Sequence, residues 1–183
     1  MDKDRAENAV RELLLALDLD PNEEGLRDTP KRVAKMYMAQ HTNENAELER
    51  TFVGVKFDEL VLIQDIPMSS FCEHHLLPWY GKAHVAYIPN KKLLGLSKLA
   101  RLVYSCSKGF TIQEGVTARI ADRLFDEVEP KGVMVVIKAV HTCMTLRGAK
   151  AVGANTITSA VRGVHRDVPA ARHEVLSLLG NGR

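Results

Sequence analysis

Four residues of metal-ligand or acid–base type stand together in the sequence as Cys72, Glu73, His74 and His75. Thiolate sulfur and imidazole nitrogen are the donors that zinc prefers in proteins. A Cys-x-x-His spacing is a weak signal by itself, because free cysteine is among the most buried residue types and often only packs. The run therefore indicates a metal site only if further donors join it from elsewhere in the chain.

Further donors follow at the end of a strand-like segment, VMVVIKAVHTCM, which spans residues 133–144. Side chains two apart on a strand point to the same face, so His141 and Cys143 are expected to converge on one site. Apolar residues occupy the same face upstream, from Val133 to Ala139. The pattern predicts an apolar wall that leads into a polar, metal-capable end.

Cys72, His75 and Cys143 would offer zinc two thiolates and one imidazole and leave a fourth position to water, as in catalytic rather than structural sites. Zinc in such a site supplies hydroxide near neutral pH. His74 and His141 would stay unligated beside the metal, and because histidine titrates near neutral pH, both suit proton transfer. The alternative at this point is that all five are ordinary buried cysteines and loop histidines.

Basic residues on two expected helices are candidates for binding an anion. Lys98 and Arg101 lie three apart near the start of a helix that Ser97 is expected to cap, and both helix N-termini and arginine favour phosphate. The other candidates for the same anion are Arg32, Lys35 and Arg147. Each of them could instead be a solvated surface charge, because lysine and arginine are usually exposed.

Gln113 and Glu114 open the next expected helix. A carboxylate at this position is stabilised by the helix dipole and can be merely structural. It can also accept hydrogen bonds from the N1–H and the exocyclic amine of guanine, which makes Glu114 a candidate for binding a purine base. Cys106 lies mid-helix without ligand-type neighbours and is expected to pack.

The composition sets limits on the class of protein. The chain has 183 residues, of which 45% are hydrophobic and 26% charged, and its formal net charge is +2. These values fit one soluble domain and argue against binding of nucleic acid by bulk charge. No apolar run approaches the roughly 20 residues of a membrane span, and the charged N-terminus does not resemble a secretory signal. With three sparse cysteines, these features predict a cytoplasmic protein that binds neither nucleic acid nor membrane.

The elements that must position these residues follow from periodicity and turn residues. Helices are expected over residues 4–17, 97–108, 113–128 and 171–179, and a further helix is expected to begin at residue 29, with Thr29 as its cap. Two strands joined by a turn at 56–59 are expected within residues 51–66. Further strands are expected over 81–89, 133–144 and 155–163, and the last two should form a hairpin. The SSFCEHH run would lie in a loop. Hairpin pairs with helices between them predict an α+β fold, with a mainly antiparallel sheet that carries helices on one face.

In this order and with these intervals, the motifs of the chain resemble GTP cyclohydrolase I. The resemblance is carried by DTPKRVAKMY, SSFCEHHLLPWYGKAHVAYIP, GLSKLARLV, IQE, HTCMTLRGA and TITSAVRG, from about Leu26 to Val161. It implies the tunnelling fold, with an N-terminal helical segment over residues 1–48 and a catalytic domain over 49–183. It also implies a homodecamer of two rings, with each active site built from more than one subunit.

The functional residues of that family fall on matching positions of this chain. Its metal ligands fall on Cys72, His75 and Cys143, with zinc as the expected ion and iron(II) as the alternative, and its proton-transfer histidines fall on His74 and His141. Its guanine-anchoring glutamate falls on Glu114, and the adjacent Gln113 is also expected to bind substrate. Its phosphate-binding and substrate-contacting residues fall on Arg32, Lys35, Ser97, Lys98, Arg101 and Arg147.

The resemblance implies hydrolytic opening of the imidazole ring of GTP, release of formate, and closure to 7,8-dihydroneopterin triphosphate. Other enzymes with the tunnelling fold are the nearest alternatives, because one fold can host several chemistries. The resemblance to a pterin synthase would imply a zinc site of three histidines, and a 7-deazaguanine nitrile reductase has no zinc at its reaction centre. The two cysteines and one histidine of this chain fit both enzymes less well. A guanine-nucleotide binder with structural zinc is the non-catalytic alternative, and release of formate would exclude it.

Overall fold

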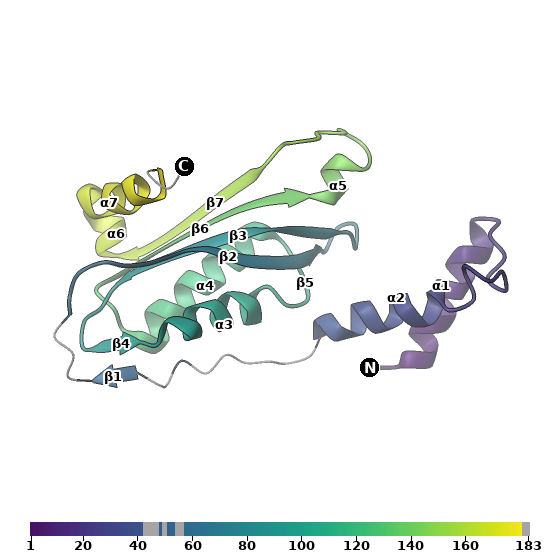
Figure 1. Cartoon of the computed structure of the whole chain (residues 1–183), viewed down its shortest axis with the longest axis horizontal. Helices are drawn as coiled ribbons and strands as arrows, with labels where there is room; N and C mark the ends of the chain where they lie inside the picture. Colours follow the sequence, from purple (N-terminus) through teal and green to yellow (C-terminus); the bar gives the residue numbers. More distant parts are fainter. Residues whose placement is uncertain (42–47, 49–50, 54–56, 181–183) are drawn as a thin grey trace. The chain divides into compact units, whose positions relative to one another are not determined.

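Long strands rich in β-branched residues form a five-stranded sheet in the order β5-β2-β3-β6-β7. The pairs β2–β3, β3–β6 and β6–β7 are antiparallel, and the short β5 joins the edge of β2 in parallel. Figure 1 shows this sheet in the computed structural model, which describes residues 1–41, 48, 51–53 and 57–180. The strands are β2 (Val61–Cys72), β3 (Pro78–Ile88), β5 (Phe110–Thr111), β6 (Gly132–His141) and β7 (Thr156–Gly163).

The main core lies between one face of the sheet and two helices, α3 (Leu96–Cys106) and α4 (Gln113–Val128). Alternate residues of β6, from Val133 to Ala139, contribute to this core, as the period of the strand predicts. The expected hairpin of β6 and β7 and the mainly antiparallel α+β fold are confirmed.

A helix also covers part of the opposite face. The C-terminal α7 (Pro169–Gly180), which follows the short α6 (Val164–Asp167), places Val175 against Ala86 and Met134 of the sheet. In Figure 1, α7 lies across the sheet from α3 and α4. The predicted arrangement, with helices on one face of the sheet, therefore holds for α3 and α4, whereas α7 lies on the opposite face.

Two compact units make up the chain, Met1–Asn43 and Glu44–Arg183. The first holds α1 (Lys3–Ala16), α2 (Thr29–Met38) and the 3-10 helix η1 (Ala39–His41). The second holds the sheet, and it also holds the two-stranded pair of β1 (Thr51–Val53) with β4 (Lys92–Leu94). The division expected between residues 48 and 49 stays a prediction.

Two predicted helix caps were wrong. Asp28 and not Thr29 is the N-cap of α2, and the Thr29 hydroxyl instead accepts a hydrogen bond from Arg32 at 3.1 Å. Gly95 and not Ser97 is the N-cap of α3, so Ser97 lies inside the first turn. The N-cap lies one residue before the expected hydroxyl in α2 and two residues before it in α3, and neither N-cap makes a side-chain hydrogen bond.

The strand pairing around the metal-ligand run also differs from expectation. The two strands within residues 51–66 do not pair, because β1 pairs with β4 instead; the expected turn between them lies partly outside the described residues. β2 continues to Cys72 and β3 begins at Pro78, where Phe71 pairs with Pro78. The expected loop is therefore short, and Cys72 belongs to a strand.

The free energy of unfolding is expected to depend on pH through His165, which lies on α6. It is fully buried, and within the described part of the chain neither ring nitrogen has a hydrogen-bond partner. A Cβ at Gly132 would lie 2.7 Å from its Nδ1, which shows how closely β6 packs against the ring. Burial lowers the pKa of His165 below its ordinary value, because the charged imidazolium loses its water.

A lowered pKa in the folded state means that the unfolded chain binds the proton more tightly. The stabilising contribution is present above the unfolded pKa of about 6.5 and is lost as the pH falls below it. We expect His165→Phe to flatten the fall in the free energy of unfolding between about pH 7.5 and pH 5, measured by urea titration. Parallel pH curves for the variant and the parent would contradict the prediction.

Within the described ranges, no helix is long and apolar enough to span a bilayer.

Candidate metal centre

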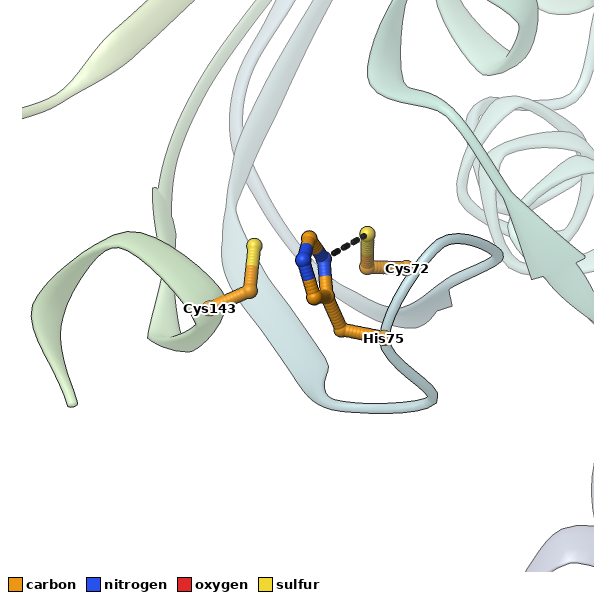
Figure 2. A group of neighbouring side chains, drawn as sticks. All are labelled: Cys72, His75 and Cys143. Carbon is orange, nitrogen blue, oxygen red and sulfur yellow. Dashed lines mark hydrogen bonds between the residues drawn. The ribbon is translucent and has the colours of Figure 1, made fainter. Parts of the chain in front are cut away.

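Three potential metal ligands from two distant parts of the chain lie together. The ligand atoms of Cys72, His75 and Cys143 are all within 4.8 Å of one another, and Cys72 Sγ is 3.7 Å from His75 Nδ1. Figure 2 shows the three side chains pointing toward one another, with the imidazole between the two sulfurs. It is the only such group of three or more found among the described residues. The ligand set predicted from the sequence is therefore close enough to share one ion.

A tight turn brings His75 back over Cys72. The Cys72 N–H donates to the Leu77 carbonyl at 2.8 Å, and the Cys72 carbonyl accepts from Leu76 N–H at 2.9 Å. Leu76 has φ 54°, a left-handed conformation that reverses the chain within the turn. The β2–β3 connection thus places both donors at one end of the sheet.

Cys143 reaches the site from a helix and not from a strand. β6 ends at His141, and Cys143 lies on the four-residue α5 (Thr142–Thr145). The expected strand over residues 133–144 was therefore too long, and the same-face argument does not apply to Cys143. The tight first turn of α5 still directs its sulfur toward Cys72 and His75 (Figure 2).

The electrostatics of the group favour a cation. Burial and the neighbouring Cys72 raise the pKa of the Cys143 thiol, because two thiolates side by side repel each other. A bound divalent ion removes that repulsion and stabilises both thiolates. Two sulfurs and one imidazole nitrogen match the donors of a zinc site with an open position.

Two further histidines flank the three ligands. His74 is exposed, and its Nδ1 lies 3.8 Å from Cys72 Sγ. His141, the last residue of β6, stacks on the buried Trp79 with ring centroids 5.2 Å apart and planes inclined by 10°. Burial lowers the pKa of His141, and the charge of Glu114 opposes that shift. Neither imidazole is part of the three-ligand group.

A cavity of about 210 Å³ connects these residues. Seven of the residues predicted for the site line it, namely Cys72, His74, His75, Gln113, Glu114, His141 and Cys143. Thr111, Ile112, Met144 and Thr156 also line it and were missed, because their side chains are neither charged nor usual metal ligands. Thr111, for example, reaches the site only because β5 pairs with β2, opposite Cys72.

The predicted phosphate-binding residues of the second unit do not line this cavity. Ser97, Lys98 and Arg101 lie on α3, and Arg147 follows α5; none is among the residues that line the cavity. Arg32 and Lys35 lie on α2 in the first unit, where the Arg32 guanidinium also approaches Asp28 at 3.8 Å. Their predicted role therefore stays a prediction.

Comparison with known proteins places the chain in a family. The sequence model described as GTP cyclohydrolase I matches residues 6–180, which is nearly the whole chain. The chain belongs to the GTP cyclohydrolase I family. Its similarity to members named GTP cyclohydrolase 1 is high over nearly full length: 52% identity with the Carboxydothermus hydrogenoformans protein, covering 99% of this chain and 96% of that one.

Further relatives give the same result. The Bacillus subtilis protein of that name is 52% identical, over 96% of this chain and 95% of its own, and the Streptococcus agalactiae protein is 47% identical, over 98% of each. Among solved structures, the apo form of the archaeosine synthase QueF-Like matches 57% of this chain and 93% of its own, with a TM-score of 0.48 and 19% identity.

Proposed function

We propose that this chain converts GTP to 7,8-dihydroneopterin triphosphate with release of formate. The observation that carries the proposal is the meeting of Cys72, His75 and Cys143 beside two unligated imidazoles, in a member of the GTP cyclohydrolase I family. A ligand set with an open position, proton-transfer groups and a carboxylate around one cavity are the parts that hydrolysis of a purine ring needs.

Cys72, His75 and Cys143 would hold zinc, with iron(II) as the alternative ion. When bound, the ion supplies Lewis acidity and a nucleophilic hydroxide near neutral pH for attack on C8 of GTP. The two thiolates offset the charge of the cation, and the turn over residues 73–77 holds the imidazole in place. The three free cysteines also fit a reducing compartment such as the cytoplasm.

His74 and His141 would move protons as the ring opens and as the ribose later rearranges. His74 is exposed and can exchange protons with water, whereas His141 is held against Trp79. The two imidazoles therefore differ in environment, which suits them to different proton transfers.

Glu114 would anchor the guanine. It lies in the first turn of α4, lines the cavity and is exposed to it, so a bound base can reach its carboxylate. One carboxylate accepts from both N1–H and the 2-amino group of guanine, which selects guanine over adenine. Binding of the base and the triphosphate would hold C8 close to the metal ligands.

The rest of the substrate site would come from neighbouring subunits. A cavity of about 210 Å³ is smaller than the roughly 300–1,000 Å³ of typical ligand pockets, so it can hold only part of GTP. α3 carries Ser97, Lys98 and Arg101, and it also exposes Leu96 and Tyr104, as an interface helix does. We place the triphosphate between subunits of a homo-oligomer, as expected for a decamer, with Arg32, Lys35 and Arg147 as its further ligands.

Turnover of GTP by the zinc-loaded protein tests the proposal. We expect equal amounts of formate and of a product with the absorbance of a dihydropterin, and no turnover after the metal is removed by a chelator. Formate without the pterin would limit the function to ring opening. Neither product, with GTP bound, would support a nucleotide-binding protein instead.

A further inference from the structure

The side chain of Gln113 makes a network of hydrogen bonds to other residues of the protein. Its side chain is 1% exposed at the start of α4. Its Nε2 lies 3.1 Å from the Ile137 carbonyl, 3.1 Å from the Thr156 carbonyl and 3.0 Å from Thr158 Oγ1. Its Oε1 lies 2.8 Å from His141 Nε2. Both ends of the amide are therefore engaged within the protein.

The two backbone carbonyls decide which way the amide points. A carbonyl oxygen can only accept, so the NH2 group of Gln113 must face Ile137 and Thr156. The Oε1 atom then faces His141, and because Oε1 can only accept, His141 Nε2 must carry the proton. In the neutral ring this leaves Nδ1 with the lone pair.

Two threonine hydroxyls close the network in one direction. Thr117 Oγ1 donates its only proton to the Gln113 main-chain carbonyl at 2.7 Å. The 2.6 Å bond between Thr117 and Thr158 must then be donated by Thr158. Gln113 Nε2 has two protons for three acceptors, so Thr158 Oγ1 accepts a proton that it shares with one of the two carbonyls. The chain of bonds starts and ends on Gln113, and a rotated amide would break it.

We propose that Gln113 is a positioning residue that holds the His141 imidazole in the Nε2–H tautomer, with the lone pair on Nδ1. This rests on the proposed function, and it gives Gln113 a positioning role in place of the expected role in substrate binding. Trp79 fixes the plane of the imidazole by stacking, and Gln113 fixes its rotation and tautomer. A contact with guanine through this amide would require it to give up one of these bonds.

Neutron diffraction of deuterated, metal-loaded crystals tests the tautomer directly, without reference to activity. At about pH 8, where histidine is ordinarily neutral, we expect a deuteron on His141 Nε2, none on Nδ1, and two on Gln113 Nε2. A deuteron on Nδ1, alone or with one on Nε2, would overturn the proposal. Absence of GTP turnover would contradict the proposed function, but it would not change the observed positions of the deuterons.

Kinetics separate a positioning role from contact with substrate. We expect Gln113→Met to lower kcat by about 10- to 100-fold with KM for GTP within about threefold of the parent, because the loss acts through the imidazole. Gln113→Glu keeps an acceptor for His141 Nε2–H but loses the bonds donated to the Ile137 and Thr156 carbonyls, so it should recover only part of kcat.

Glu114→Gln serves as the contrast, because a substrate contact should raise KM. A raised KM with unchanged kcat in Gln113→Met would show that Gln113 binds substrate and would overturn the positioning role. Metal content and circular dichroism of each variant show whether it is folded. If Gln113→Met does not fold, kcat and KM of Gln113→Glu are compared with those of the parent. A raised KM with unchanged kcat in Gln113→Glu would likewise overturn the positioning role.

Discussion

Replacing Cys143 by alanine is expected to remove the bound metal and with it nearly all release of formate from GTP. Among the described residues, the group has three protein donors within 4.8 Å of one another, so loss of one sulfur leaves two protein ligands. Protein zinc sites bind with about 10–16 kcal/mol over four ligands, so one ligand accounts for about a hundred- to a thousandfold in affinity. Formate release should fall by at least about a thousandfold, because the nucleophile is no longer generated near neutral pH.

Cys106→Ala is the matched control. Cys106 is also a buried thiol, but it lies in the core on α3 and outside the three-ligand group. Burial raises the pKa of its thiol, as expected for a cysteine that only packs. The control should keep its metal, measured by atomic absorption, and its activity, while losing about 1 kcal/mol of stability to a small cavity. Full formate release by Cys143→Ala would refute the assigned ligand set.

Replacing Gly81 by alanine is expected to prevent correct pairing of β3 with β6. Gly81 faces Ala139 in the register of these strands, next to the end of the sheet that carries the site. A Cβ at position 81 would overlap the Lys138 carbonyl oxygen and would lie 2.6 Å from Ala139 Cα. Both are backbone atoms of a central strand and cannot rotate away, so the sheet itself would have to shift.

We expect Gly81→Ala to lose about 3 kcal/mol or more of stability, the upper end for an overpacked core. Thermal unfolding and the yield of folded protein measure this loss. Gly115→Ala is the control, because its Cβ would meet only Ile112 Cγ1 at an ordinary 3.4 Å, within α4. It should be neutral or stabilising by up to about 1 kcal/mol. A Gly81→Ala protein as stable as the parent would mean that β3 and β6 lie further apart than described.

Helices were easier to predict than the ends of strands. The helix over Gln113–Val128 was predicted residue for residue, because an apolar stripe of period 3.6 runs its whole length. The strand over 133–144 was predicted too long, because Thr142 and Cys143 offer no local signal that separates a strand from a short helix. The partner of β1 was missed for a related reason: its pairing depends on Lys92–Leu94, which lie 39 to 43 positions further along the chain.

The sequence by itself determined which residues can do chemistry. Cys72, His75, Cys143, His74 and His141 are identified by residue type, spacing and family resemblance, since donor chemistry is a property of each side chain. Only the tertiary structure decided how they act together. The turn after β2 and the first turn of α5 bring the three donors to one point, and the carbonyls of Ile137 and Thr156 orient Gln113 against His141. Distances and hydrogen-bond directions between residues far apart in the chain arise from packing, which no local pattern contains.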